Sequence, residues 1–178
     1  MLQGERIKVS QKGFTLLELL VAVSIMAVAT CAAGAGIFQT FQNNERNNDR
    51  NTAITQLENA SYWISRDVLM SQVVDTSGSD FFSANWTEYE SGDIYEVTYT
   101  FADMDEGDYK KLLRTQSING TDNTTRLVAE HINSEPSKTT CNFTDGIFYI
   151  SITVTAGEGG LTQSETRTYE IVPRPGRG

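Results

Sequence analysis

Residues 14–38 read FTLLELLVAVSIMAVATCAAGAGIF, and Glu18 is the only charged residue among these 25. A helix of that length spans about 37 Å, which is enough to cross a hydrocarbon core of about 30 Å. An ionised side chain inside a bilayer costs about 2.5–3.5 kcal/mol even on lenient insertion scales, so Glu18 needs a partner. The stretch therefore predicts a membrane-spanning helix whose single acid has a role beyond anchoring.

The leader before this stretch is basic, whereas the rest of the chain is acidic. Residues 1–13, MLQGERIKVSQKG, contain Arg6, Lys8 and Lys12 against Glu5, a net charge of +2. The positive-inside tendency keeps such a leader in the cytoplasm while the following residues cross the membrane. The whole chain of 178 residues carries −9, so subtracting +2 leaves −11 for residues 14–178. We therefore expect an acidic exported part.

Three simpler explanations of the N-terminus fit less well. An ordinary secretory signal has a shorter uncharged core that ends in an A-x-A-like site, and Glu18 argues against it. A lipoprotein signal ending at Cys31 would need a small residue where Thr30 stands. A plain membrane anchor leaves Glu18 unexplained.

The segment Lys12–Ala22, KGFTLLELLVA, resembles the class III signal of bacterial type IV prepilins and type II secretion pseudopilins. The resemblance implies that prepilin peptidase cuts between Gly13 and Phe14 and methylates the new amino group of Phe14, while the apolar helix stays in the product. Physical chemistry then gives Glu18 a role, because its carboxylate can pair with the Phe14 amine of a neighbouring subunit in a low-dielectric filament core.

The resemblance also implies a location and a set of partners. The protein would sit in the inner (cytoplasmic) membrane as a single-pass protein, with its N-terminus inside and its C-terminal domain outside, and then join an extracytoplasmic filament. Its partners would be prepilin peptidase, other pilin or pseudopilin subunits, an inner-membrane assembly platform and, before assembly, the lipid bilayer. The acidic charge argues against a nucleic-acid partner.

A polar stretch, residues 39–52, follows the apolar segment and contains five asparagines. Asparagine is a poor helix former, and Gly34 and Gly36 upstream each cost about 1 kcal/mol relative to alanine, so a continuous helix here is expected to be weak. The stretch is either a solvated spacer or, as in related filaments, a deliberately soft segment. Both readings stay open.

Helical spacing of apolar residues returns over residues 53–74, where Leu57, Ala60, Ile64 and Val68 recur three and four positions apart. The end of this segment, residues 63–74, resembles the long helix of J-type minor pseudopilins, in which a pair like Arg66–Asp67 often occurs. Alternatively, these adjacent charges are merely solvated on the helix surface.

Alternating patterns beyond the turn at residues 75–80 predict an antiparallel sheet. Apolar side chains alternate along residues 95–101, and a hairpin partner is expected around residues 112–114. Residues 126–132 are a weaker strand candidate, and residues 148–154 and 167–171 flank a turn at 156–160 as a second hairpin.

These segments predict an α+β, pilin-like ladle: a long N-terminal helix whose first half spans the membrane and whose second half packs on an antiparallel β-sheet. Its parts are a cytoplasmic leader (1–13), a transmembrane or filament-core helix (14–38), a polar and then amphipathic continuation of the helix (39–75) and an extracytoplasmic β-rich globular domain (76–178).

Little in the chain suggests catalysis. The single histidine, His131, lies in a predicted strand without a second histidine to help bind a metal, and no phosphate-cradling glycine loop occurs. We therefore predict that the protein is not an enzyme and needs no cofactor. His131 is expected to be a surface or sheet residue.

No metal site is predicted, although Asp103, Asp105 and Asp108 form a weak calcium candidate. Their spacing fails the EF-hand pattern, because Glu106 precedes the glycine and Arg114 occupies the twelfth position. A polar hairpin turn explains them better. Cys31 and Cys141 are expected to remain unpaired with each other, since one lies in the apolar segment and the other in an exported loop.

The resemblance leaves two functions open. The first is a structural subunit, and a minor one, of a type II secretion pseudopilus or a type IV pilus. The alternative is a major type IV pilin with a role in adhesion or DNA uptake, for which the charge of −11 offers no support.

Overall fold

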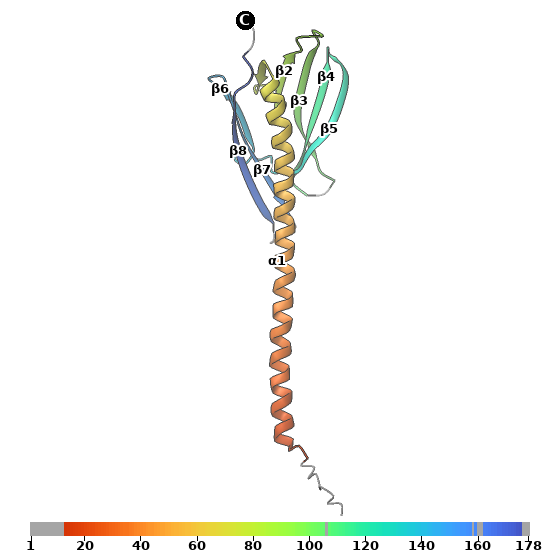
Figure 1. The fold of residues 1–178 in the computed structure, drawn as a ribbon, viewed down its shortest axis with the longest axis vertical. Helices are drawn as coiled ribbons and strands as arrows, with labels where there is room; N and C mark the ends of the chain where they lie inside the picture. Colours follow the sequence, from red (N-terminus) through yellow and green to blue (C-terminus); the bar gives the residue numbers. More distant parts are fainter. Residues whose placement is uncertain (1–12, 106, 158, 160–161, 176–178) are drawn as a thin grey trace, which may run out of the picture. The chain divides into compact units, whose positions relative to one another are not determined.

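The computed structural model describes residues 13–105, 107–157, 159 and 162–175 (Figure 1). The chain divides into two compact units, Met1–Asn44 and Glu45–Gly178. One helix precedes eight strands: α1 (Leu16–Met70), β1 (Val73–Asp75), β2 (Phe82–Thr87), β3 (Ile94–Asp103), β4 (Lys110–Ile118), β5 (Thr121–Ile132), β6 (Thr140–Thr144), β7 (Ile147–Ala156) and β8 (Gln163–Ile171).

The first unit contains the apolar part of α1, and its side chains are exposed. Those from Phe14 to Phe41 that are large and apolar are between 48% and 88% exposed. By length and composition, α1 can cross a membrane, and none of its most apolar stretch is buried within the protein. The helix predicted over residues 14–38 is thus confirmed from Leu16 onward, whereas residues 1–12 of the predicted leader lie outside the described residues.

The polar stretch 39–52 is helical throughout, as a continuation of the helix that begins at Leu16. The weakness expected of this part of the helix stays a prediction. Helix propensities differ by less than about 1 kcal/mol per residue, and tertiary contacts readily override them. Within the second unit, Arg50 Nε donates to Glu165 Oε1 on β8 at 2.8 Å. Gly157, at φ +98°, lets the chain after β7 approach the same part of α1, since a Cβ there would stand 2.6 Å from Asp49 Oδ2.

The second half of α1 buries one stripe of side chains against the sheet. The stripe consists of Ala53, Leu57, Ala60, Ile64, Asp67 and Val68, whose three- and four-residue spacing places them on one helix face. The predicted packing of this half on the sheet is therefore confirmed. Asp67, however, is an unexpected member of an otherwise apolar stripe.

The helix ends at Met70 rather than continuing to Val74. Ser71 N–H still donates to the Asp67 carbonyl at 3.0 Å, but Gln72 N–H donates to the Asn85 carbonyl of β2 at 2.8 Å. Because the backbone at Gln72 already pairs with a strand, residues 73–75 extend that pairing as β1.

The eight strands form one antiparallel sheet in the order β1-β2-β3-β4-β5-β7-β6, with β8 on β7 (Figure 1). The strands predicted around residues 95–101, 112–114, 126–132, 148–154 and 167–171 lie in β3, β4, β5, β7 and β8. The short strands β1, β2 and β6 were not predicted. The observed fold confirms an α+β class with a long apolar N-terminal helix and a curled antiparallel sheet.

The core lies between the buried stripe of α1 and the inner face of the sheet. Phe82 stacks on Tyr99 with ring centroids 4.5 Å apart and also contacts Phe148 at 4.9 Å. All three aromatic side chains are at most 1% exposed. Leu57 of α1 is fully buried in the same core, so helix and sheet share one hydrophobic cluster.

We predict that Leu57→Ala lowers the free energy of unfolding of the second unit by about 2–5 kcal/mol, because it removes a fully buried side chain and leaves a cavity. Leu69→Ala is the matched control on the same helix, since Leu69 is 56% exposed. Urea unfolding of the full chain in uncharged detergent, followed by the fluorescence of Trp63 and Trp86, measures both. Equal effects of the two substitutions would contradict this assignment of the buried face.

Candidate functional site

The start of α1 is capped by two residues of the apolar segment itself. Thr15 N–H and Thr15 Oγ1 both donate to Glu18 Oε2 at 2.9 Å, and Glu18 N–H donates to Thr15 Oγ1 at 3.3 Å. This reciprocal pair is a capping box, in which a Thr and a Glu three positions later satisfy each other's free N–H groups. The cap fixes the Glu18 carboxylate beside the first turn of the helix.

The predicted cleavage point immediately precedes this cap. Gly13 and Phe14 are exposed, and Phe14 retains 88% of its accessible surface. Apart from the chain neighbours of Gly13, no atom of the described residues lies within 4 Å of the position that a Cβ on Gly13 would occupy. Among these residues, no contact covers the bond between Gly13 and Phe14.

Both donors of Thr15 use one oxygen of the Glu18 carboxylate. The other oxygen, Oε1, has no hydrogen bond within the part of the chain that the structure describes. A carboxylate can accept several hydrogen bonds, so Oε1 can accept from a further donor without opening the cap. The negative charge also lies at the positive end of the helix dipole, where it is favoured.

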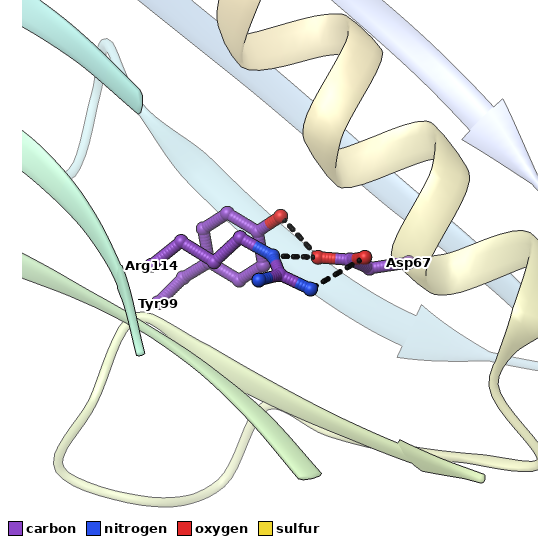
Figure 2. A network of polar contacts seen from close by, with 3 residues as sticks. All are labelled: Asp67, Tyr99 and Arg114. Carbon is purple, nitrogen blue, oxygen red and sulfur yellow. Dashed lines mark hydrogen bonds and ion pairs between the residues drawn. The ribbon is translucent and has the colours of Figure 1, made fainter. Parts of the chain in front are cut away.

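A second polar arrangement lies inside the second unit and joins α1 to the sheet (Figure 2). Arg114 of β4 donates to Asp67 of α1 twice, from Nε to Oδ2 at 2.5 Å and from Nη2 to Oδ1 at 3.0 Å. Tyr99 of β3 donates its hydroxyl to Asp67 Oδ2 at 2.7 Å. Tyr99 and Arg114 are direct cross-strand partners, so adjacent strands present both donors to one carboxylate.

This network is almost completely shielded from water. Asp67 is 1% exposed, Arg114 4% and Tyr99 0%. Burial and the nearby Asp67 charge raise the pKa of Tyr99 above its usual value, which keeps the hydroxyl protonated as a donor. Burial opposes the charge on Arg114, but its hydrogen bonds to Asp67 and the Asp67 charge raise the Arg114 pKa. The arrangement has the features of a structural ion pair and presents no open substrate position.

The calcium candidates lie around the turn between β3 and β4, where lysines engage two of them. Asp103 pairs with Lys110, and Asp105 pairs with Lys111 at 3.4 Å. The hydrogen bond and positive charge of Lys110 lower the pKa of Asp103. Among the described residues, no three His, Cys, Asp or Glu side chains are grouped so that they could hold a metal ion.

His131 lies in β5, as expected for a sheet residue, but its backbone is unusual. Its φ of +58° is left-handed, and the pairing of β4 with β5 shifts between Lys110–Ile132 and Leu112–Ala129. Such a shift marks a β-bulge, which explains the backbone without any catalytic role. Cys31 and Cys141 are free thiols, and burial raises the pKa of Cys141 to about 11.

Sequence reasoning missed the capping role of Thr15 and the partners of Asp67. The Thr-x-x-Glu spacing at residues 15–18 is a sequence pattern that predicts the cap. The sequence also indicates that Asp67 faces the core, because it lies three positions after Ile64 on the apolar stripe. The adjacent residues Arg66 and Asp67 therefore have different surroundings. Asp67 is buried and pairs with Arg114, while Arg66 is exposed.

A comparison with protein-family models matches residues 8–33 to the prokaryotic N-terminal methylation motif. The match confirms the resemblance to type IV pilins and pseudopilins that residues 12–22 indicated, and the family is a structural one. The more specific resemblance to J-type subunits stays a prediction. Comparisons with curated proteins and with solved structures give no match.

We predict that Asp67→Ala lowers the free energy of unfolding by about 3–5 kcal/mol, because it leaves the Arg114 guanidinium buried without its counter-charge. The double variant Asp67→Leu with Arg114→Met should recover much of the loss, since it removes both charges. Urea unfolding of the full chain in detergent measures these differences.

The matched control is Glu58→Ala, which breaks an exposed ion pair from the same helix, Glu58–Arg167 at 4.0 Å. Exposed pairs contribute at most about 1 kcal/mol, so this variant should stay near wild type. If Asp67→Ala were as mild as Glu58→Ala, the buried pair would not be what holds the helix to the sheet.

Proposed function

Because the chain carries the N-terminal methylation motif of the type IV pilin and pseudopilin family, we propose that it is a minor structural subunit of a type IV filament, in a type II secretion pseudopilus or a type IV pilus. One observation carries the proposal: the methylation motif, residues 8–33, includes most of an apolar helical segment whose large side chains are exposed along its length. Such a surface requires a bilayer or neighbouring apolar helices as its surroundings.

In the proposed sequence of events, the protein is first anchored in the inner membrane by residues 14–38. Prepilin peptidase then hydrolyses the peptide bond between Gly13 and Phe14 on the cytoplasmic side, which releases the basic leader and frees the amino group of Phe14. The peptidase next transfers a methyl group to this amine from a sulfonium methyl donor, and the nitrogen loses one proton. The apolar segment stays attached to the domain and leaves the bilayer only when it enters the filament.

The position of Glu18 supports its proposed role in assembly. Its carboxylate lies one turn from Phe14, its Oε2 is engaged by Thr15, and its Oε1 is available. The amine of Phe14 in a neighbouring subunit can donate to Oε1, so that two charges neutralise each other where water is scarce. The capping box keeps the carboxylate in one place, which lowers the entropy lost on pairing.

The major-pilin alternative, with a role in adhesion or DNA uptake, differs in copy number along the filament. The acidic charge of the exported residues opposes a DNA-binding role. Quantitative mass spectrometry of isolated filaments discriminates the alternatives: a minor subunit is scarce relative to one abundant pilin, whereas a major pilin is itself that abundant species.

We predict that the mature protein begins with N-methyl-Phe14. Intact-mass measurement in cells with and without prepilin peptidase should show loss of residues 1–13 and gain of one methyl group only when the enzyme is present. Gly13→Ala should be processed better than Gly13→Leu, because the peptidase must accommodate the flank of the bond, while the protein itself has open space there. An unchanged leader in both strains would contradict the processing proposal.

We further predict that Glu18→Gln gives a membrane-inserted protein that incorporates poorly into filaments. Glutamine can retain the capping box but lacks the charge that pairs with the Phe14 amine. The matched control is Thr15→Ala, which removes both hydrogen bonds of the Thr15 hydroxyl and keeps the charge of Glu18, so it should incorporate better than Glu18→Gln. Immunoblots of membrane and filament fractions measure both steps, and normal incorporation of Glu18→Gln would exclude the charge-pairing role.

A further inference from the structure

Three arginines from different elements surround one tryptophan of α1. The guanidinium carbons of Arg114, Arg66 and Arg126 lie 5.1, 5.4 and 5.9 Å from the centroid of the Trp63 ring. These distances suit cation–π contacts, which hold a guanidinium in a preferred place. The ring thus gathers positive charge from α1, β4 and β5 at one point of an acidic protein.

Within the described part of the chain, Arg114 is the only one of the three arginines with a carboxylate partner. Asp67 neutralises Arg114 in the core, whereas Arg66 and Arg126 are exposed and form no ion pair among the described residues. Of the other described basic residues, Arg50, Lys110, Lys111 and Arg167 pair with a carboxylate, whereas Arg46, Lys138 and Arg174 do not. Arg66 and Arg126 differ from those three because both contact the Trp63 ring. The chain has 23 acidic residues against 14 basic ones, yet the fold brings none of the described carboxylates to these two guanidiniums.

Arg126 stands directly opposite Arg114 in the pairing of β4 with β5. Like charges at directly opposed positions destabilise a sheet, but the Asp67 carboxylate offsets the charge of Arg114. The exposed guanidinium of Arg126 therefore remains as positive charge at this position.

The surface beside Arg66 is apolar. The residues three and four positions away on the helix are Tyr62, Trp63, Leu69 and Met70, and none of them is acidic. Tyr62, Arg66, Leu69 and Met70 line a shallow groove between α1 and β8. Glu58 and Arg167 also line this groove, where their opposite charges form an exposed ion pair at 4.0 Å. Tyr62 and Leu69 are 61% and 56% exposed. The positively charged Arg66 and Arg126 therefore lie beside exposed apolar side chains of α1.

We propose that Arg66 and Arg126, together with the groove beside Arg66, form a docking surface for an acidic helical segment of a partner protein. The arginines would bind carboxylates on one face of that segment, and the groove would bind its adjacent apolar side chains. Two arginines held on one ring need less ordering on binding than free side chains do. The surface goes beyond the filament-assembly role and uses neither Phe14 nor Glu18.

Charge and geometry favour a protein partner over a nucleic acid. The acidic residues of the protein would repel a long polyanion such as a nucleic acid. A short segment with two carboxylates is attracted by the two arginines and is too short to reach most of those acidic residues. Base binding on a single strand uses an open aromatic face, but guanidiniums already contact the Trp63 ring.

The test uses the full chain in uncharged detergent and a fluorescent helical peptide with two glutamates four positions apart beside leucines. Its twin carries glutamines instead, and a single-stranded DNA oligonucleotide is the third probe. We expect anisotropy to report binding of the acidic peptide, about tenfold weaker binding of the twin, and no binding of the DNA. Signal from empty micelles is subtracted.

The double variant Arg66→Gln with Arg126→Gln should lower the affinity for the acidic peptide by about tenfold. The double variant Arg66→Lys with Arg126→Lys should restore part of that affinity. The matched control, Arg46→Gln with Lys138→Gln, removes two positive charges elsewhere and should change binding less than about twofold, since weak long-range attraction remains screened. Thermal unfolding by circular dichroism verifies that each variant folds.

The proposal is overturned by absence of peptide binding, by equal binding of the acidic peptide and its twin, or by equal effects of the two double variants. Tighter binding of the DNA oligonucleotide than of the acidic peptide would also overturn it and would indicate a nucleic-acid surface instead. None of these outcomes bears on cleavage at Gly13 or on the role of Glu18.

Discussion

The carboxylate of Asp67 is the constraint on which the second unit depends. It is buried on the helix stripe that covers the sheet, and it accepts hydrogen bonds from Arg114 and Tyr99 on neighbouring strands. A buried ion pair adds little net stability compared with a well-packed apolar substitute, but a buried charge without its partner is costly. The pair therefore penalises any rotation or sliding of α1 that would separate Asp67 from Arg114, while Leu57, Ile64 and Val68 supply the apolar contact.

The apolar residues of the first unit differ from those of the core, because no other described part of the protein covers them. Phe14 and Leu16 are more than four-fifths exposed. Exposing so many apolar side chains to water is unfavourable, which agrees with the bilayer or neighbouring subunits proposed as their surroundings. Glu18 stands out in this segment for the same reason that Asp67 does in the core: an acid in an apolar setting is tolerated when donors satisfy it. Thr15 supplies two of those donors.

The sequence was sufficient for the class of fold and for the N-terminal signature, since a long apolar run, helical spacing and strand alternation are local patterns. It was insufficient where tertiary contacts decide. Residues 39–52 look like poor helix formers, yet contacts such as Arg50–Glu165 accompany an unbroken helix. Residues 73–75 continue an apolar helical pattern but pair with β2 instead. The partnership of Asp67 with Arg114 spans 47 positions, and no local pattern connects them.

The central claim, that residues 14–38 leave the membrane as the shared core of a filament, is tested most directly at Cys31. In a Cys141→Ser background Cys31 is the single thiol of the chain, and it is exposed in the isolated protein. A maleimide should fail to label Cys31 in intact isolated filaments and should label it once organic solvent and denaturant separate the subunits. Labelling of Cys31 at the same rate in intact filaments and in separated subunits would contradict the account.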